Sequence, residues 1–142
     1  MKQRSGFTWI ELIVLILITA VLASITIPKF KDLIVRSKEA NTKAGLASLR
    51  SALRVYYAEN QSYPADNLES LTKDGKYIPE IPTTQIPGTT HVDTNEVFLG
   101  TEINDAGGWL YNNDKTVPVK WGKIFVNCSH KDHLGEITWS EL

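Results

Sequence analysis

The N-terminal part of the chain holds a long apolar run that begins directly after a single carboxylate, Glu11. Residues 12–27 are apolar except for three residues with hydroxyl groups, Thr19, Ser24 and Thr26. Such hydroxyls can bond back to carbonyls of their own helix, so they do not interrupt an apolar surface. Residues 7–28 number 22. As a helix they would be about 33 Å long, which is enough to cross a bilayer.

The pattern changes after Pro28 from uniformly apolar to amphipathic. Leu46, Leu49, Leu53 and Tyr56 recur at spacings of three and four, which is the period of one helix face. We therefore predict that the helix continues over residues 29–60, with this stripe packed on a globular head. Pro28 lacks an amide donor, so we expect a kink or local loosening there.

Residues 61–142 read as a connecting loop followed by short strands. Four of the six prolines lie at positions 64–87, around a short predicted helix over residues 67–73. The predicted strands cover residues 97–103, 109–112, 117–126 and 136–139, with turn-forming residues between them. One long helix followed by a run of strands predicts an α+β fold, in which a small antiparallel sheet packs on the C-terminal half of the helix. Three tryptophans and a tyrosine are expected to pack in or on this sheet: Trp109, Trp121, Trp139 and Tyr111.

Charge and cysteine content limit what the head can be. The net charge is −1, but residues 1–59 sum to +5 and residues 60–142 to −6. An acidic head argues against specific nucleic-acid binding, and a basic stem can attract the head of a neighbouring copy. Cys128 is the single cysteine, so the chain cannot form an internal disulfide.

Glu11 is the only charged residue between Phe7 and Pro28. A carboxylate inside such a segment costs about 2–3 kcal/mol on insertion scales, so it needs a partner or a purpose. The partner must come from another chain, or from a charge that processing creates.

These N-terminal features together resemble the type IV prepilin and pseudopilin family. The resemblance consists of a short basic leader (Lys2, Arg4) ending at Gly6, then Phe7, Glu11 four residues later, and the apolar run. Pro28 and the helical continuation extend it to about the first 82 residues. It implies cleavage between Gly6 and Phe7, N-methylation of the new Phe7 amine, and polymerisation. It also supplies a partner for Glu11, the Phe7 amine of a neighbouring subunit.

The resemblance implies four segments and a structural role. They are a leader peptide (1–6), a hydrophobic transmembrane and assembly helix (7–28), an amphipathic continuation (29–60) and a globular head (61–142). The expected function is a major-pilin-like subunit of a type IV pilus, a helical homopolymer. The expected partners are a prepilin peptidase, an assembly ATPase and its inner-membrane platform. The chain is expected in the cytoplasmic membrane before assembly, with its head outside the cytoplasm, and afterwards in a cell-surface filament or a periplasmic pseudopilus.

Several alternatives stay open at this level. Within the family they are a major pseudopilin of a type II secretion system and a minor pilin. Outside it, a membrane-anchored binding protein would keep the leader or be cut before Ser24 as an ordinary secretory signal peptide. An enzyme is not expected, because the sequence has no Gly-x-Ser-x-Gly, His-Glu-x-x-His or phosphate-loop motif.

Two groups of residues are weak candidates for metal ligands. Cys128, His130 and His133 lie within six residues, but zinc sites usually combine distant pairs of ligands, so a solvated loop is preferred. Asp105 and Asp114 are weak calcium candidates, together with neighbouring asparagines at positions 104, 112 and 113. Major pseudopilins bind calcium in a comparable C-terminal loop, but we expect these residues to form Asx turns instead. No resident cofactor is expected.

Overall fold

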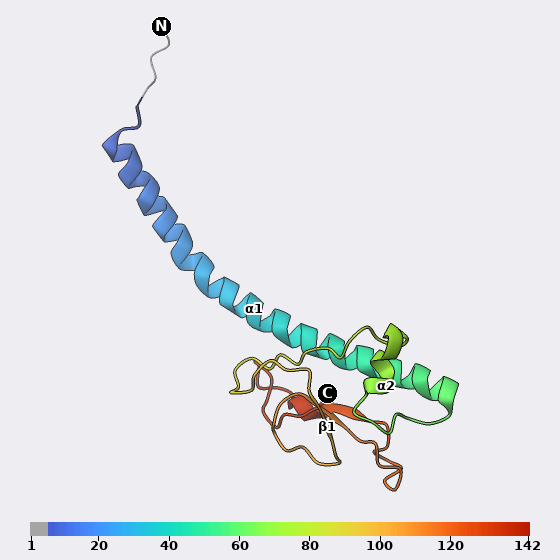
Figure 1. Ribbon diagram of the computed structural model, residues 1–142. Coiled ribbons are helices and arrows are strands. Elements are labelled where there is room, and N and C mark those ends of the chain that lie inside the picture. The colour runs from blue at the N-terminus through green and yellow to red at the C-terminus, as the bar shows by residue number, and fades with distance from the viewer. Residues whose placement is uncertain (1–5) are drawn as a thin grey trace. The chain divides into compact units, whose positions relative to one another are not determined.

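The computed structural model describes residues 6–142 and contains one long helix, a small sheet and short helical turns (Figure 1). Residues 1–5 of the expected leader lie outside the described part. The chain divides into two compact units, Met1–Ile34 and Val35–Leu142. The elements in chain order are α1 (Trp9–Asn60), α2 (Glu69–Thr72), η1 (Lys73–Gly75), β1 (Val97–Leu99), β2 (Trp109–Tyr111), β3 (Ile124–Val126) and η2 (Trp139–Glu141).

The first unit consists, in its described part, of the N-terminal portion of α1 and the three residues before it. Every residue over positions 6–34 is exposed, although most of them are apolar. An 18-residue window of α1 has a mean hydropathy of 2.7 and no buried residue, so by length and composition the helix can cross a membrane. The helical assignment passes through Pro28 without a break.

The second unit has a core built on one face of α1. Its buried helix residues follow spacings of three and four, as the stripe predicts: Glu39, Thr42, Gly45, Leu46, Leu49, Ala52 and Leu53. Tyr56, the last residue of the predicted stripe, is partly buried and packs against the same core. In Figure 1 the sheet and α2 lie along this C-terminal half of α1. The α+β prediction and the packing of the stripe are confirmed.

The sheet has the order β1-β2-β3 and is mixed, which corrects the predicted antiparallel arrangement. β2 and β3 are antiparallel, with Trp109 opposite Val126, whereas β1 and β2 are parallel, with Val97 opposite Trp109. Parallel pairing requires the chain to return to the starting end of the sheet. Residues 100–108 provide that return, since they form a loop without regular structure.

All four predicted strand segments are shorter than expected or are not strands, and residues 97–103 and 109–112 contribute only the three residues each of β1 and β2. Residues 117–123 form turns, because Pro118 removes an amide donor and Gly122 has a φ of 75°. Residues 136–139 make only an isolated bridge between Lys131 and Thr138. Thr138 then starts η2 through a capping box with Glu141, which turns the chain into a helical conformation.

Buried aromatic residues of the sheet form hydrogen bonds to the proline-rich loop, residues 64–87. The Trp109 indole N–H donates to the Pro82 carbonyl at 2.7 Å, and the Tyr111 hydroxyl donates to the Pro64 carbonyl at 2.7 Å. Both side chains and Trp139 are fully buried, as predicted for core residues. Trp121 differs, because it is half-buried and packs edge-on against Tyr63.

Candidate functional site

The start of α1 places Glu11 in a local hydrogen-bonding arrangement with Thr8. The Thr8 amide and hydroxyl both donate to Glu11 Oε2, at 3.2 and 3.0 Å, and the Glu11 amide donates to Thr8 Oγ1 at 3.3 Å. This is a capping box, in which the residue before the helix and the third helical residue satisfy each other's amides. The Thr-x-x-Glu spacing of the sequence carries this information, but we predicted a partner only from another chain or from a charge that processing creates. The capping box lies on the C-terminal side of the expected cleavage point, so cleavage between Gly6 and Phe7 would leave it intact.

The helix surface that follows Glu11 is apolar and has no outward polar bonds. Phe7, Trp9 and Ile10 are 69, 78 and 65% exposed, and the large apolar residues from Leu12 to Ile34 are also exposed. The three hydroxyls within this surface all donate to carbonyls of their own helix, Thr19 to Leu15 and Ile16, Ser24 to Val21, and Thr26 to Leu22. A surface of this kind favours lipid or another apolar helix over water.

Pro28 lies inside this exposed part of α1. Because proline has no amide hydrogen, the carbonyl of Ser24 lacks its usual intrahelical donor. Pro28 and Glu11 lie in the same helix but do not contact each other. Any role that they share in assembly would therefore act through the molecules around the helix.

Three of the five asparagine and aspartate residues considered as calcium candidates form local turns, as expected: Asn104, Asn112 and Asp114. Hydrogen bonds from the side chain and the amide of Thr116 lower the pKa of Asp114, and the amide donates to Asp114 Oδ1 at 2.8 Å. Asn112 Oδ1 accepts from the Asp114 amide, and Asn104 Oδ1 accepts from the Ala106 amide. These are Asx-turn bonds between a side chain and the backbone two residues later. Asp114 and Asp105 share no hydrogen-bond partner, so the two weak calcium candidates serve different parts of the backbone.

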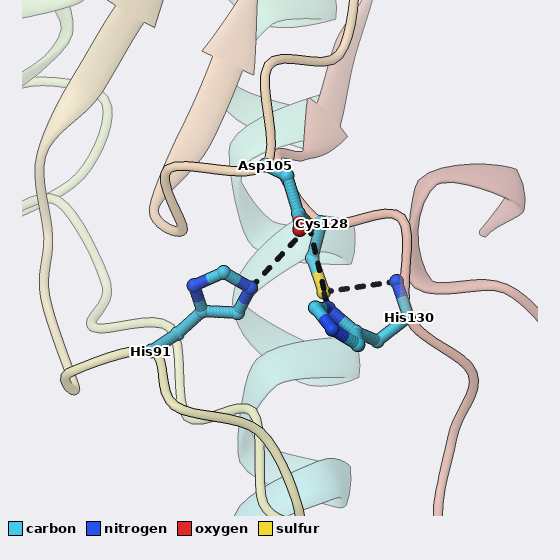
Figure 2. Close-up of side chains that lie close together, drawn as sticks. All are labelled: His91, Asp105, Cys128 and His130. Atoms are coloured by element: carbon cyan, nitrogen blue, oxygen red, sulfur yellow. Dashed lines mark hydrogen bonds and ion pairs between the residues drawn. The ribbon is translucent and has the colours of Figure 1, made fainter.

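Asp105 makes a different set of contacts from the other turn residues (Figure 2). Its Oδ1 accepts from the Ser129 amide at 2.7 Å, and this bond holds the pKa of Asp105 below its ordinary value. The same oxygen lies 3.4 Å from His91 Nε2 and 3.4 Å from His130 Nδ1. Cys128 Sγ lies 3.4 Å from His130 Nδ1, and burial raises the pKa of the thiol to about 11.

The structure thus joins only two of the three residues that the sequence grouped as soft ligands. Cys128 and His130 come together with His91 and Asp105, while the amide of His133 donates to Glu39 Oε1 at 2.6 Å. His91 is 37 residues before Cys128 in the sequence, so spacing alone did not connect them.

Comparison with curated proteins finds relatives among fimbrial and type IV pilin proteins and among type II secretion system core proteins G. Over 82 residues the chain is 34% identical to fimbrial protein EcpC of Eikenella corrodens, covering 55% of this chain and 54% of that protein. It is 26% identical over 123 residues to the type IV major pilin protein PilE of Neisseria gonorrhoeae, covering 83% and 72%. It is 32% identical over 74 residues to the type II secretion system core protein G of Pseudomonas aeruginosa, covering 51% and 52%.

These alignments span about half the length of EcpC and of core protein G. No family model matches the chain, and no solved structure matches it.

Proposed function

We propose that this chain, whose curated relatives support its assignment to the type IV pilin and pseudopilin family, is a structural subunit of a type IV pilus filament. The observation that carries the proposal is the exposed apolar part of α1, which starts at a single capped carboxylate. The relatives are structural proteins, so we propose a structural role and no enzymatic one. We also propose no specific nucleic-acid partner, because the head is acidic.

The exposed helix surface supplies the driving force for assembly. Large apolar residues over positions 7–34 are between about two-fifths and four-fifths exposed. Burying apolar surface contributes about 25 cal/mol per Å², so a few hundred Å² against each neighbour gives several kcal/mol before the entropy cost of association. Before assembly the same surface is compatible with the bilayer, and so we place the helix in the cytoplasmic membrane with the head outside the cytoplasm.

Glu11 sets the register in this mechanism. Thr8 occupies one carboxylate oxygen, Oε2, and thereby orients the side chain. Cleavage after Gly6 would create an ammonium group at Phe7, and the Phe7 amine of a neighbouring subunit could then pair with the Glu11 carboxylate. A carboxylate without a partner in an apolar helix bundle raises the free energy, and pairing with an ammonium group lowers it again. The favourable axial offset between neighbouring helices is therefore the one that forms this pair.

The proposal implies several partners. A prepilin peptidase would cut between Gly6 and Phe7, and an assembly ATPase with its inner-membrane platform would extract the helix from the bilayer. The main partner is a second copy of this chain. Pro28 lies where the missing helical bond lets the helix adjust to its neighbours during packing.

Processing and assembly test the proposal separately. Mass spectrometry of the protein from its native membrane should find an N-terminal N-methyl-Phe7, and a chain that begins at Ser24 or retains Met1 would refute the family assignment. Glu11→Val should insert into membranes at least as well as the wild type but enter filaments poorly. Asp32→Val is the matched control, because it removes a carboxylate of the same helix outside the apolar run. Equal incorporation of Glu11→Val and wild type would remove the register role.

A major pseudopilin of a type II secretion system is the second candidate, and the core protein G relatives favour it. Deletion of the gene distinguishes the two, since loss of surface filaments supports the pilus and loss of exoprotein secretion supports the pseudopilus. We further propose that Asp114 acts in its Asx turn and not as a calcium ligand. Millimolar calcium should therefore leave the melting temperature of Asp114→Asn and wild type equally unchanged.

A further inference from the structure

Four side chains that could bind a metal converge within the head (Figure 2). His91 comes from the loop before β1, Asp105 from the loop between β1 and β2, and Cys128 and His130 from the segment after β3. One ligand atom from each lies within 4.8 Å of all the others. We propose that these four residues form a zinc-binding site, a property that goes beyond the filament role.

The distances suit a tetrahedral ion. Tetrahedral zinc with bonds of about 2.0–2.3 Å places its ligand atoms about 3.3–3.8 Å apart. Three of the contacts in the cluster have this length. His91 Nε2 and His130 Nδ1 each lie 3.4 Å from Asp105 Oδ1, and Cys128 Sγ lies 3.4 Å from His130 Nδ1. The other separations are at most 4.8 Å, so closing them around an ion needs only a small inward movement.

Burial indicates that the cluster is more than a chance surface grouping. Cys128 is fully buried and the His91 side chain is 9% exposed. Among the residues that the structure describes, His91 Nε2 is a buried nitrogen without a hydrogen-bond partner, although it faces the other three ligand atoms. A buried polar atom without a partner is costly, and a bound cation would satisfy it. Asp105 and His130 are 36 and 48% exposed on their side chains, so they leave an entry path.

Backbone amides support the two groups that would carry negative charge. The Ser129 amide donates to Asp105 Oδ1, and the His130 amide donates to Cys128 Sγ at 3.3 Å. Such contacts fix ligand orientation around a metal. In the metal-free protein the buried thiol keeps its proton, so binding must release that proton as the thiolate bonds to the ion.

The ligand types favour zinc over calcium. Two imidazoles, one thiolate and one carboxylate form a mixed nitrogen, sulfur and oxygen set, whereas calcium takes six to eight oxygen atoms. The site would connect three loops of a head that has no second cysteine for a disulfide. Zinc should then stabilise the head by binding the folded state alone.

Metal titration of the detergent-solubilised full-length chain, stripped with a chelator, tests the proposal. We expect one zinc ion per chain with a dissociation constant below about 1 μM, and a melting temperature that rises by several degrees and falls again when chelator is added. Cobalt(II) should give the visible bands of a tetrahedral ion and a thiolate charge-transfer band in the near ultraviolet. Millimolar calcium should neither displace the zinc nor raise the melting temperature.

Variants decide which residues bind the ion. Cys128→Ala should lose the charge-transfer band. His130→Ala should weaken zinc binding by about 10-fold to 100-fold. His130 is half-exposed, so its variant keeps the test valid even where Cys128→Ala folds poorly. His133→Ala is the matched control and should bind like the wild type, because its side chain lies outside the cluster. Absence of stoichiometric binding would overturn the proposal and leave a hydrogen-bonded cluster. Binding that survives in His130→Ala, or that is lost equally in His133→Ala, would also overturn it.

Discussion

The two parts of α1 use the same residue types for opposite purposes. Leu17, in the first unit, is 60% exposed, whereas Leu53, in the second, is 2% exposed. Within residues 6–34, no other segment covers the leucines and isoleucines of the helix, whereas in the second unit the sheet and the proline-rich loop do. Apolar content therefore does not show whether the rest of the same chain buries the apolar face of a helix. The distribution of polar residues does show it. In the second part polar residues occupy the helix faces beside the apolar stripe, whereas in the first part the apolar residues extend around the helix.

Hydrogen bonding distinguishes the two parts in the same way. Polar side chains of residues 6–34 bond only within their own helix or its first turn. In the second unit they reach across the chain. Thr42 donates to the Gln85 carbonyl at 2.8 Å and accepts from the Gln85 amide at 2.7 Å, and Glu39 accepts from the His133 amide. The contacts that stabilise the second unit therefore come from its own residues, whereas the apolar surface of the first unit needs lipid or another helix to cover it.

The largest expected effect comes from placing a charge in each part. Leu53→Asp puts an unpaired carboxylate in the buried core and should destabilise the head by several kcal/mol, enough to unfold it. Leu17→Asp places the same charge on an exposed surface, so the head should melt as in the wild type while membrane insertion and assembly fail. Circular dichroism melting of both variants in detergent measures the contrast. Similar melting curves for the two would show that the stripe does not hold the head together.

A smaller effect is expected where α1 closely approaches the proline-rich loop. A Cβ atom at Gly45 would lie 2.9 Å from Pro82 Cβ and 3.4 Å from the Trp109 ring. Overpacking of this kind costs about 1–3 kcal/mol, which exceeds the gain of at most about 1 kcal/mol from removing a helical glycine. Gly45→Val should therefore lower the melting temperature. Ser48→Val, at an exposed position on the same helix, is the control and should change it little.

The capping box should contribute less and only locally. Thr8→Val removes the hydroxyl that accepts from the Glu11 amide, and loss of an N-cap typically costs about 1 kcal/mol. Amide hydrogen exchange in micelles should then be roughly fivefold faster at Glu11, with no change in the head. Thr19→Val is the control, since the Thr19 hydroxyl donates to carbonyls in the helix interior. Unchanged exchange at Glu11 would mean that the first turn is held by other contacts.

The smallest effect is expected from an exposed ion pair in the second unit. Glu59 accepts hydrogen bonds from Lys76 and from the Tyr77 hydroxyl, and these bonds lower the pKa of Glu59 and raise that of Lys76. A depressed carboxyl pKa stabilises the fold above the unfolded value, near 4.5, and the gain is lost as the pH falls through the folded value. Glu59→Gln should thus melt slightly below the wild type at neutral pH, and the difference should vanish in acid. Solvent screening keeps it small. A difference that grows in acid would contradict this assignment.

The sequence was informative where a repeating pattern decides the structure. The spacing of Leu46, Leu49 and Leu53 predicted the buried face, and the helix ends at Asn60 as expected. Strand pairing was harder to predict, because the parallel partner of β2 depends on the path of residues 100–108 and not on alternation within a strand. Very short strands also carry little pattern, since each contains only three residues.

The sites show the same limit. Thr8 and Glu11 are close in sequence, so their capping box could have been predicted from the spacing. The cluster of His91, Asp105, Cys128 and His130 could not, since three separate loops deliver it. Local chemistry predicted Asx turns at Asn104 and Asp114, but the same chemistry gave no reason why Asp105 should instead accept from Ser129.

The self-contained hydroxyls of Thr19, Ser24 and Thr26 have a consequence for how the helix moves between environments. Since each donates to a carbonyl of its own helix, no hydrogen bond must be broken when the surrounding molecules are exchanged. Neighbouring helices could also slide or rotate against this surface without losing a directional contact. In the proposed filament, Glu11 would then be the one side chain of this segment that determines position along the helix. The rest of the surface would be interchangeable, which suits the proposed movement of the helix from the bilayer into a filament and back.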